Sequence, residues 1–182
     1  MGIFKVLLLF RERSFSGIGE EIMKFLPIGP ENREKVNEFI ARHWLSTDIL
    51  IRGEIFDSTT CEGFLLENEE SKKIVALITY DIRPTECEIV TLNSLIEGIG
   101  IAAKLIDRVA GIARAHGCQR LVVMTTNDNM KSISFYQRNG FDMVKIYRNS
   151  INENRYLKPS IPKISRFTGI PMSHEIEFEM IL

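Results

Sequence analysis

The chain has 182 residues, 23 of them basic and 24 acidic, which gives a formal net charge of −1. With 45% hydrophobic and 26% charged residues, its composition is typical of a globular protein, and its length predicts one domain. The balanced charge argues against the basic excess that nucleic-acid binding requires and against a polybasic membrane anchor. We therefore expect neither nucleic acid nor a membrane as a partner.

Cysteine and histidine are both scarce. The three cysteines, Cys61, Cys87 and Cys118, are an odd number without a CxxC pair, so they predict neither a disulfide framework nor a zinc site. Three histidines are too few for a histidine-rich metal centre. We expect no metal, a reducing environment and a cytoplasmic location.

The first residues need a separate interpretation. The apolar run Ile3–Phe10 contains Lys5 and is followed directly by charged residues, unlike a signal peptide. It is also far shorter than the ~20 residues that span a bilayer. An extra edge strand and a leader upstream of the real start both remain open. Because a strand pattern begins at Met23, we predict an N-terminal extension over 1–22 and a single domain over 23–182.

The first half of the chain predicts a strand, a helix and then several strands. Pro30 stands where proline opens a helix, and apolar residues follow at helical spacing as far as Trp44. Runs of strand-forming residues separated by polar breaks come next. The expected elements are a strand at 24–28, a helix up to 44, a weaker helix between 47 and 56, and strands at 61–67, 74–82 and 86–93.

In the second half of the chain, the spacing of the apolar residues becomes helical. After Gly98-Ile99-Gly100, apolar residues recur every three to four positions and predict a helix that ends at His116-Gly117. The remaining expectations are a strand at 121–125, a helix at 130–138, a strand at 141–147 and an alternating last strand at 175–180. Strands that alternate with helices imply right-handed crossovers and a partly parallel sheet.

The glycine turn allows three interpretations. Glycines let the backbone approach a ligand, and the first amides of the following helix suit a pyrophosphate. The glycines can equally form only a tight turn. Gly98-x-Gly100-x-x-Ala103 also matches a dinucleotide fingerprint, although the acidic residue expected ~20 positions later is represented only by the more distant Asp128.

Two motifs carry a resemblance to a known family. Glu97-Gly98-Ile99-Gly100-Ile101-Ala102 resembles the Q/R-x-x-G-x-G/A motif of the GNAT superfamily of N-acyltransferases, with Glu97 where that family has Gln or Arg. Further on, the stretch from Asn129 to Phe141 resembles the second signature, N-x-x-A-x-x-F-Y-x-x-x-G-F, and only Ser132 departs from it. The two motifs in this order are far more specific than either alone.

The resemblance implies an α/β (α+β) fold: a mixed, mostly antiparallel central sheet with a splayed parallel strand pair and helices on both faces. It implies an N-acetyltransferase that transfers the acetyl group of acetyl-CoA, its co-substrate, directly to an amine-bearing acceptor. Neither the acceptor nor the oligomeric state follows from it, and a homodimer stays open. Alternatives are a non-catalytic acyl-CoA-binding module and, less favoured, a dinucleotide-binding oxidoreductase fragment.

By the same resemblance, residues around the glycine turn would hold the cofactor. Backbone amides of the turn and helix start would bind the pyrophosphate, backbone groups of the preceding strand would pair with the pantetheine arm, and Asn129 and Ser132 would contact that arm. The departure at Glu97 puts in doubt any cationic side-chain help to the phosphates, but it does not affect the backbone amides. The predicted set is Leu92, Asn93, Ser94, Glu97, Gly98, Ile99, Gly100, Ile101, Ala102, Asn129, Ser132 and Tyr136.

Two residues are expected to carry the chemistry. Tyr136 would donate a proton to the departing thiolate, since a phenol of pKa ~10 stays protonated at neutral pH. Glu88 would accept the proton of the amine, and Glu86 lies on the same face of that strand. Each of these residues also has a purely structural interpretation. Tyr136 can be a packing residue of the core, and Glu86 and Glu88 can be solvated carboxylates. Asn129 also suits a helix N-cap. His43 and Trp44 lie where the superfamily shapes its acceptor pocket.

Overall fold

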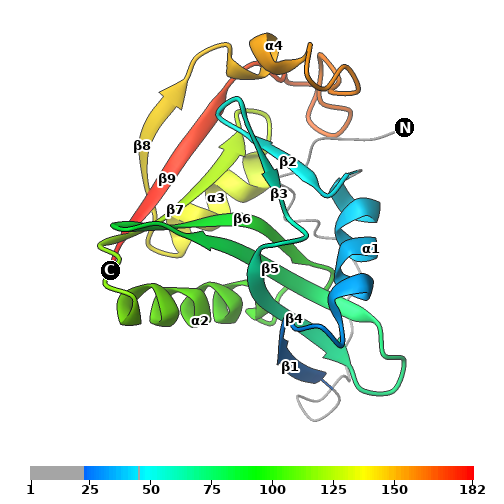
Figure 1. Ribbon diagram of the computed structural model, residues 1–182. Coiled ribbons are helices and arrows are strands. Elements are labelled where there is room, and N and C mark those ends of the chain that lie inside the picture. The colour runs from blue at the N-terminus through cyan, green and yellow to red at the C-terminus, as the bar shows by residue number, and fades with distance from the viewer. Residues whose placement is uncertain (1–22, 45) are drawn as a thin grey trace.

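The computed structural model describes residues 23–44 and 46–182, so the expectations for Ile3–Phe10 and for 1–22 lie outside the described residues. A twisted central sheet carries helices on both sides (Figure 1). The elements are β1 (Met23–Pro27), α1 (Arg33–Trp44), β2 (Asp48–Ile51), β3 (Glu54–Asp57), β4 (Glu62–Asn68), β5 (Ile74–Ile82), β6 (Glu86–Ser94), α2 (Ile101–Ala115), β7 (Arg120–Thr126), α3 (Met130–Arg138), β8 (Asp142–Tyr147), α4 (Ser150–Asn154) and β9 (Glu175–Ile181).

The large sheet has seven strands in the order β1-β4-β5-β6-β7-β9-β8. Its neighbours are antiparallel except for β6 and β7, which run parallel. The β6–β7 pairing ends at Ile89 opposite Val123, although β6 continues to Ser94 and β7 to Thr126. The predicted mixed sheet with a splayed parallel pair is therefore confirmed.

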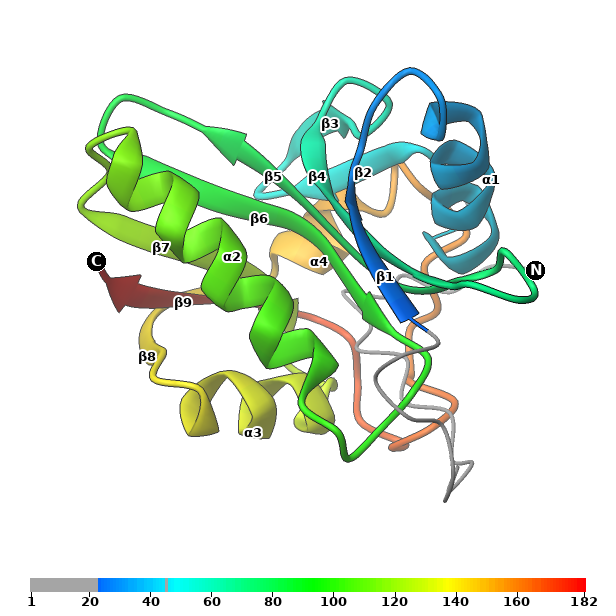
Figure 2. The same ribbon diagram turned by 90° about the horizontal axis from the view of Figure 1, so that it is seen from below.

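Different elements cover the two faces of the sheet. On one face, α2 and α3 pack through Leu105, Val109, Ile133 and Tyr136 into the larger core cluster. On the other face, α1 and β2 pack through Val36, Ile40 and Ile49 into a second cluster. Seen from below, α2 and α3 lie in front of the sheet, and α1 lies beyond it (Figure 2). The sheet thus separates two environments, one beneath α2 and α3 and the other beneath α1 and β2.

The weaker helix expected between residues 47 and 56 is wrong. This stretch forms a separate two-stranded sheet in which β2 pairs with β3. Arg52 and Gly53 connect the strands with φ of 52° and 81°, the positive angles of a tight two-residue hairpin turn. Ile49, Leu50 and Ile51 are all buried, so a short strand that is covered on both sides explains the continuous apolar run.

Within residues 23–44 and 46–182, no helix is long and apolar enough to cross a membrane. The same residues contain no group of three or more His, Cys, Asp or Glu side chains that could hold a metal ion.

Candidate functional site

The glycine turn lies at the end of β6, where the chain enters α2. Gly98 and Gly100 have φ of 82° and 73°, in the left-handed region, and a Cβ atom at either position would meet nothing within 4 Å. Gly100 is the N-cap of α2 and provides no side-chain cap. The first amides of a helix have no intrahelical acceptor. The turn therefore presents open backbone donors with partial positive charge, as an anion requires.

A cavity of about 580 Å³, the turn cavity, opens between this turn and α3. Predicted cofactor residues on its wall are Ser94, Glu97, Gly98, Gly100, Ile101 and Ala102, and α3 adds Met130, Lys131, Ser134, Phe135, Arg138 and Asn139. The Lys131 ammonium lies 3.6 Å from the Glu97 carboxylate. A cationic group therefore faces the turn from α3, on the opposite wall from the position where the family carries Gln or Arg.

The splayed end of β6 holds Leu92, Asn93 and Ser94, which are all buried. They pair with β5 on one side only, because β7 has already separated from β6. The Oδ1 atom of Asn93 accepts a hydrogen bond of 2.7 Å from the Trp44 indole, which ties α1 to this strand. A register shift between Thr79 and Tyr80 marks a bulge in β6 at Val90, just past the point of separation. This segment of β6 therefore lies beyond the pairing with β7.

The second motif forms the start of α3. Asn129 is the N-cap, and its side chain accepts a hydrogen bond of 3.2 Å from the Ser132 amide, as its residue type predicts. Ser132 is completely buried. Neither side chain is on the wall of the turn cavity. The structure therefore gives Asn129 a capping role, and its predicted contact with a ligand stays a prediction.

Tyr136 lies inside the core rather than on a cavity wall. Its ring packs between Phe141 and Phe178, with ring centroids at 5.5 and 5.6 Å, and its side chain is fully buried. Its hydroxyl has no hydrogen-bond partner among the described residues. Burial raises the pKa of this hydroxyl above its ordinary value, so it keeps its proton at neutral pH. A protonated phenol that lacks a hydrogen-bond acceptor can act as a proton donor.

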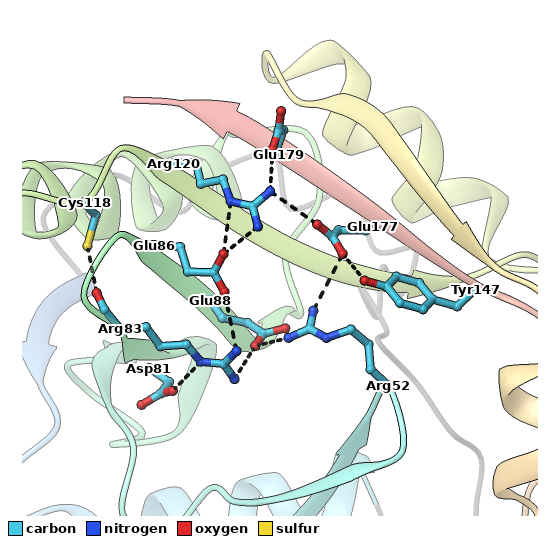
Figure 3. A network of polar contacts seen from close by, with 10 residues as sticks. All are labelled: Arg52, Asp81, Arg83, Glu86, Glu88, Cys118, Arg120, Tyr147, Glu177 and Glu179. Atoms are coloured by element: carbon cyan, nitrogen blue, oxygen red, sulfur yellow. Dashed lines mark hydrogen bonds and ion pairs between the residues drawn. The ribbon is translucent and has the colours of Figure 1, made fainter.

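Glu88 lies on the other face of β6, in a network of ion pairs (Figure 3). Its side chain is fully buried, and its Oε2 atom is 2.7 Å from Arg52 and 3.0 Å from Arg83. Its Oε1 atom has no hydrogen-bond partner among the described residues. Burial raises the pKa of the Glu88 carboxyl above its ordinary value, while the two guanidiniums act in the opposite direction. One oxygen is therefore held in place, and the other is buried without a hydrogen-bond partner.

A second cavity, of about 430 Å³, lies above this network; we call it the charged cavity. Its walls are Arg52, Arg83, Glu86, Arg120, Val144, Lys145, Tyr147, Glu177 and Glu179. Arg120 binds Glu86 and Glu179 at 2.6 and 2.7 Å, and the Tyr147 hydroxyl donates to Glu177 at 2.5 Å. The sequence analysis identified only Glu86 and Glu88 here. Gly53 between two short apolar runs is a turn signal that could have placed the neighbouring Arg52 in a turn.

His43 and Trp44 are not on the wall of either cavity. Trp44 is buried, and the His43 ring lies 4.3 Å from that of Phe39. They stand at the end of α1, where the structure gives them packing contacts, and their predicted role in shaping an acceptor pocket stays a prediction.

Comparison with known families gives a match to the acetyltransferase (GNAT) family over residues 17–141. The chain belongs to the GNAT family. The match begins inside the stretch 1–22, and the boundary at Met23 remains a prediction. Among curated proteins, the uncharacterized protein YdhI of Bacillus subtilis (strain 168) is 35% identical over 161 residues, which are 88% of this chain and 99% of the relative. YxbD of the same organism is 30% identical and covers 85% and 96%.

Solved structures of GNAT enzymes share the fold. A GNAT family acetyltransferase from Elizabethkingia anophelis with acetyl-CoA bound has a TM-score of 0.59 and 19% identity, covering 90% of this chain and all of that one. The IAA acetyltransferase from Bacillus cereus has a TM-score of 0.61 and 18% identity, covering 88% and 99%. These likenesses establish the GNAT fold for the chain. Because five of the six neighbouring strand pairs are antiparallel, the sheet does not fit the parallel dinucleotide-binding fold.

Proposed function

We propose that the chain is an N-acetyltransferase that transfers the acetyl group of acetyl-CoA directly to an amine. The observation that carries this proposal is the placement of two unsatisfied groups beside the separating strands β6 and β7. The protonated Tyr136 hydroxyl lies on the face covered by α2 and α3, and the open Glu88 oxygen lies on the face covered by α1 and β2. A donor and an acceptor of protons thus flank the point where the strands part.

The residues of the turn cavity fit acetyl-CoA. Open amides at the start of α2 suit its pyrophosphate, and Lys131 and Arg138 add positive charge on the opposite wall. From Ser94 back to Val90, β6 extends over roughly 13 Å at 3.3 Å per residue. This stretch lies beyond the pairing of β6 with β7 and would guide an amide-bearing arm from the turn to the point of separation.

Acetyl-CoA supplies a thioester whose carbonyl carbon bonds to the acceptor nitrogen as its bond to sulfur breaks. Glu88 accepts the proton that the nitrogen gives up, through its free Oε1 atom. Tyr136 donates its proton to the sulfur, and a raised pKa keeps that proton available. The products are the N-acetylated acceptor and free coenzyme A, and proton exchange with solvent returns both side chains to their starting states.

The test begins with ligand binding. A ligand specific for the folded state adds about 2.7 kcal/mol of stability at a hundredfold excess over its dissociation constant. Acetyl-CoA should therefore raise the melting temperature, whereas NAD and NADP should not. The opposite ranking would refute the proposal in favour of a dinucleotide.

A matched pair of variants tests the place of binding. Gly100→Asp puts negative charge at the turn and should abolish the shift by acetyl-CoA. Gly117→Asp is the control: Gly117 has φ of 79°, equally open surroundings, and lies at the far end of α2. Both variants should lose about 1 kcal/mol through backbone strain, and only the first should lose binding. Thiol release with a panel of amines then separates an enzyme from a module that binds acetyl-CoA without turnover.

A further inference from the structure

The charged cavity contains cations of two kinds. Arg83 and Arg120 are each paired with three carboxylates. Arg83 bonds to Asp81, Glu86 and Glu88 through its three nitrogens, and Arg120 bonds to Glu86, Glu177 and Glu179. Their charges are therefore neutralised by carboxylates within the wall of the cavity.

Lys145 is different. It is exposed on β8, and its ammonium lies 4.4 Å from the centroid of the Tyr147 ring. Glu177 stands opposite it in the β8–β9 register, but that carboxylate accepts hydrogen bonds from Tyr147 and Arg120. Within residues 23–44 and 46–182, Lys145 forms no ion pair with a carboxylate. A full positive charge thus faces the cavity without a counter-ion.

Arg52 adds further donors on the same wall. Its Nη2 atom bonds to Glu88, but the next carboxylate, that of Glu177, is 4.0 Å from its Nη1 atom. Its Nε and Nη1 groups form no hydrogen bond within the part of the chain that the structure describes. Arg52 and Lys145 together could bind an oxyanion, since guanidinium and ammonium donors make the strongest hydrogen bonds to such groups.

A carboxylate that could receive an amine lies directly behind the cavity wall. Glu88 lies beneath Arg52 and Arg83, and its buried Oε1 atom lacks a donor. An amine N–H would satisfy this oxygen, and a buried acceptor without a partner costs about 1–3 kcal/mol. The charged cavity therefore offers an anion position at Lys145 and Arg52, and a ligand bound there would direct its amine toward Glu88, which lies behind the cavity wall.

We propose that the acceptor is a small amine that carries an anionic group, such as the carboxylate of an amino acid. This inference rests on the proposed acetyl transfer and names its substrate class. The walls of the charged cavity carry four cationic and three carboxylate side chains, so the anionic group of such an acceptor meets a wall with a net positive charge. At about 30 Å³ for each water-sized group, the cavity volume corresponds to on the order of 14 non-hydrogen atoms, the size of a small metabolite.

The experiment compares matched acceptors on the full chain loaded with coenzyme A. Each set contains an amino acid, its amide and its decarboxylated amine, which share the reacting nitrogen and differ in the anionic group. Binding is measured by calorimetry, and kcat/KM is measured by thiol release from acetyl-CoA. The amino acid should bind about 10- to 100-fold more tightly than its amide, the range expected for one charged hydrogen bond.

Variants of Lys145 locate the anion position. Lys145→Met should remove most of this preference and leave binding of the amide and of coenzyme A within about twofold, because those ligands do not need the ammonium. Lys145→Arg should restore the preference, and Lys73→Met, at an exposed lysine on a distant loop, should not alter it. Higher salt should weaken binding of the amino acid more than that of the decarboxylated amine.

The outcomes separate this inference from the proposed function. If coenzyme A binds but the amide or the decarboxylated amine is preferred, or no anionic acceptor binds, the inference is refuted and acetyl transfer stands. A preference that survives Lys145→Met also refutes it. If coenzyme A does not bind to the wild-type protein, the proposed function fails first and the inference with it.

Discussion

Replacement of Tyr136 by phenylalanine should make the protein more stable and less active. The ring keeps its contacts with Phe141 and Phe178, and only the hydroxyl is lost. A buried hydroxyl without a partner costs about 1–3 kcal/mol, and the small void left behind offsets part of that gain. We expect a net gain of about 1 kcal/mol, equivalent to about 2–4 °C in melting temperature for a chain of this size.

Turnover should fall at the same time. Proton donation by a positioned side chain typically contributes roughly 10²- to 10⁴-fold, so Tyr136→Phe should lower the single-turnover rate by about that range. Affinity for acetyl-CoA should hardly change, because the hydroxyl acts mainly as charge develops on sulfur. Calorimetric melting and rapid-mixing kinetics measure the two effects on one preparation.

Tyr80 provides the matched control. It is buried in the same core cluster, but its hydroxyl donates to Glu62 at 3.0 Å. Tyr80→Phe should therefore lose about 0.5–1.5 kcal/mol and leave turnover unchanged. If Tyr136→Phe behaves like Tyr80→Phe, with lower stability and normal turnover, the Tyr136 hydroxyl is a structural group and the assigned role is wrong.

Three further predictions follow from the site and its surroundings. For Glu88, kcat/KM should fall as the pH drops through an apparent pKa above the ordinary 4.5 of a glutamate, since the base acts only when deprotonated. Glu88→Gln should remove this fall in kcat/KM at low pH. If the fall persists and follows the pKa of the acceptor amine, Glu88 is excluded as the base. Trp44→Phe removes the buried donor to Asn93 and should cost about 1–3 kcal/mol in denaturant unfolding, whereas an unchanged midpoint would show that the bond adds nothing. A chain that begins at Met23 should fold with an unchanged melting temperature and bind acetyl-CoA, and a loss above ~2 kcal/mol would mean that the preceding residues pack on the domain.

Local signals in the sequence predicted the elements around the turn cavity. The three-to-four spacing after Gly100 gives α2, and Asn129 caps α3 through the Ser132 amide. Each of these features depends on residues a few positions apart, so pattern and propensity suffice. The start of α1 was less accurate: the helix begins at Arg33 rather than directly after Pro30.

The charged cavity could not be predicted in the same way. Arg52 binds Glu88 across 36 positions, and its amide donates to Glu175 across 123 positions. No local pattern indicates which of 24 acidic residues will meet a particular arginine. The short run that contains Arg52 is also ambiguous, because a buried strand and a buried helix segment of this length have similar compositions.

The two cavities also differ in how their walls are encoded. Every residue of the turn cavity comes from the uninterrupted stretch 94–139, whereas the charged cavity is assembled from strands and turns between positions 52 and 179. One wall of the charged cavity is the tip of the β2–β3 hairpin, which belongs to its own small sheet. Substitutions in that tip, or on the edge strand β8, can reshape the charged cavity and leave the stretch 94–139 untouched. Under the proposed function, the acceptor site can therefore change while the acetyl-CoA site is inherited unchanged.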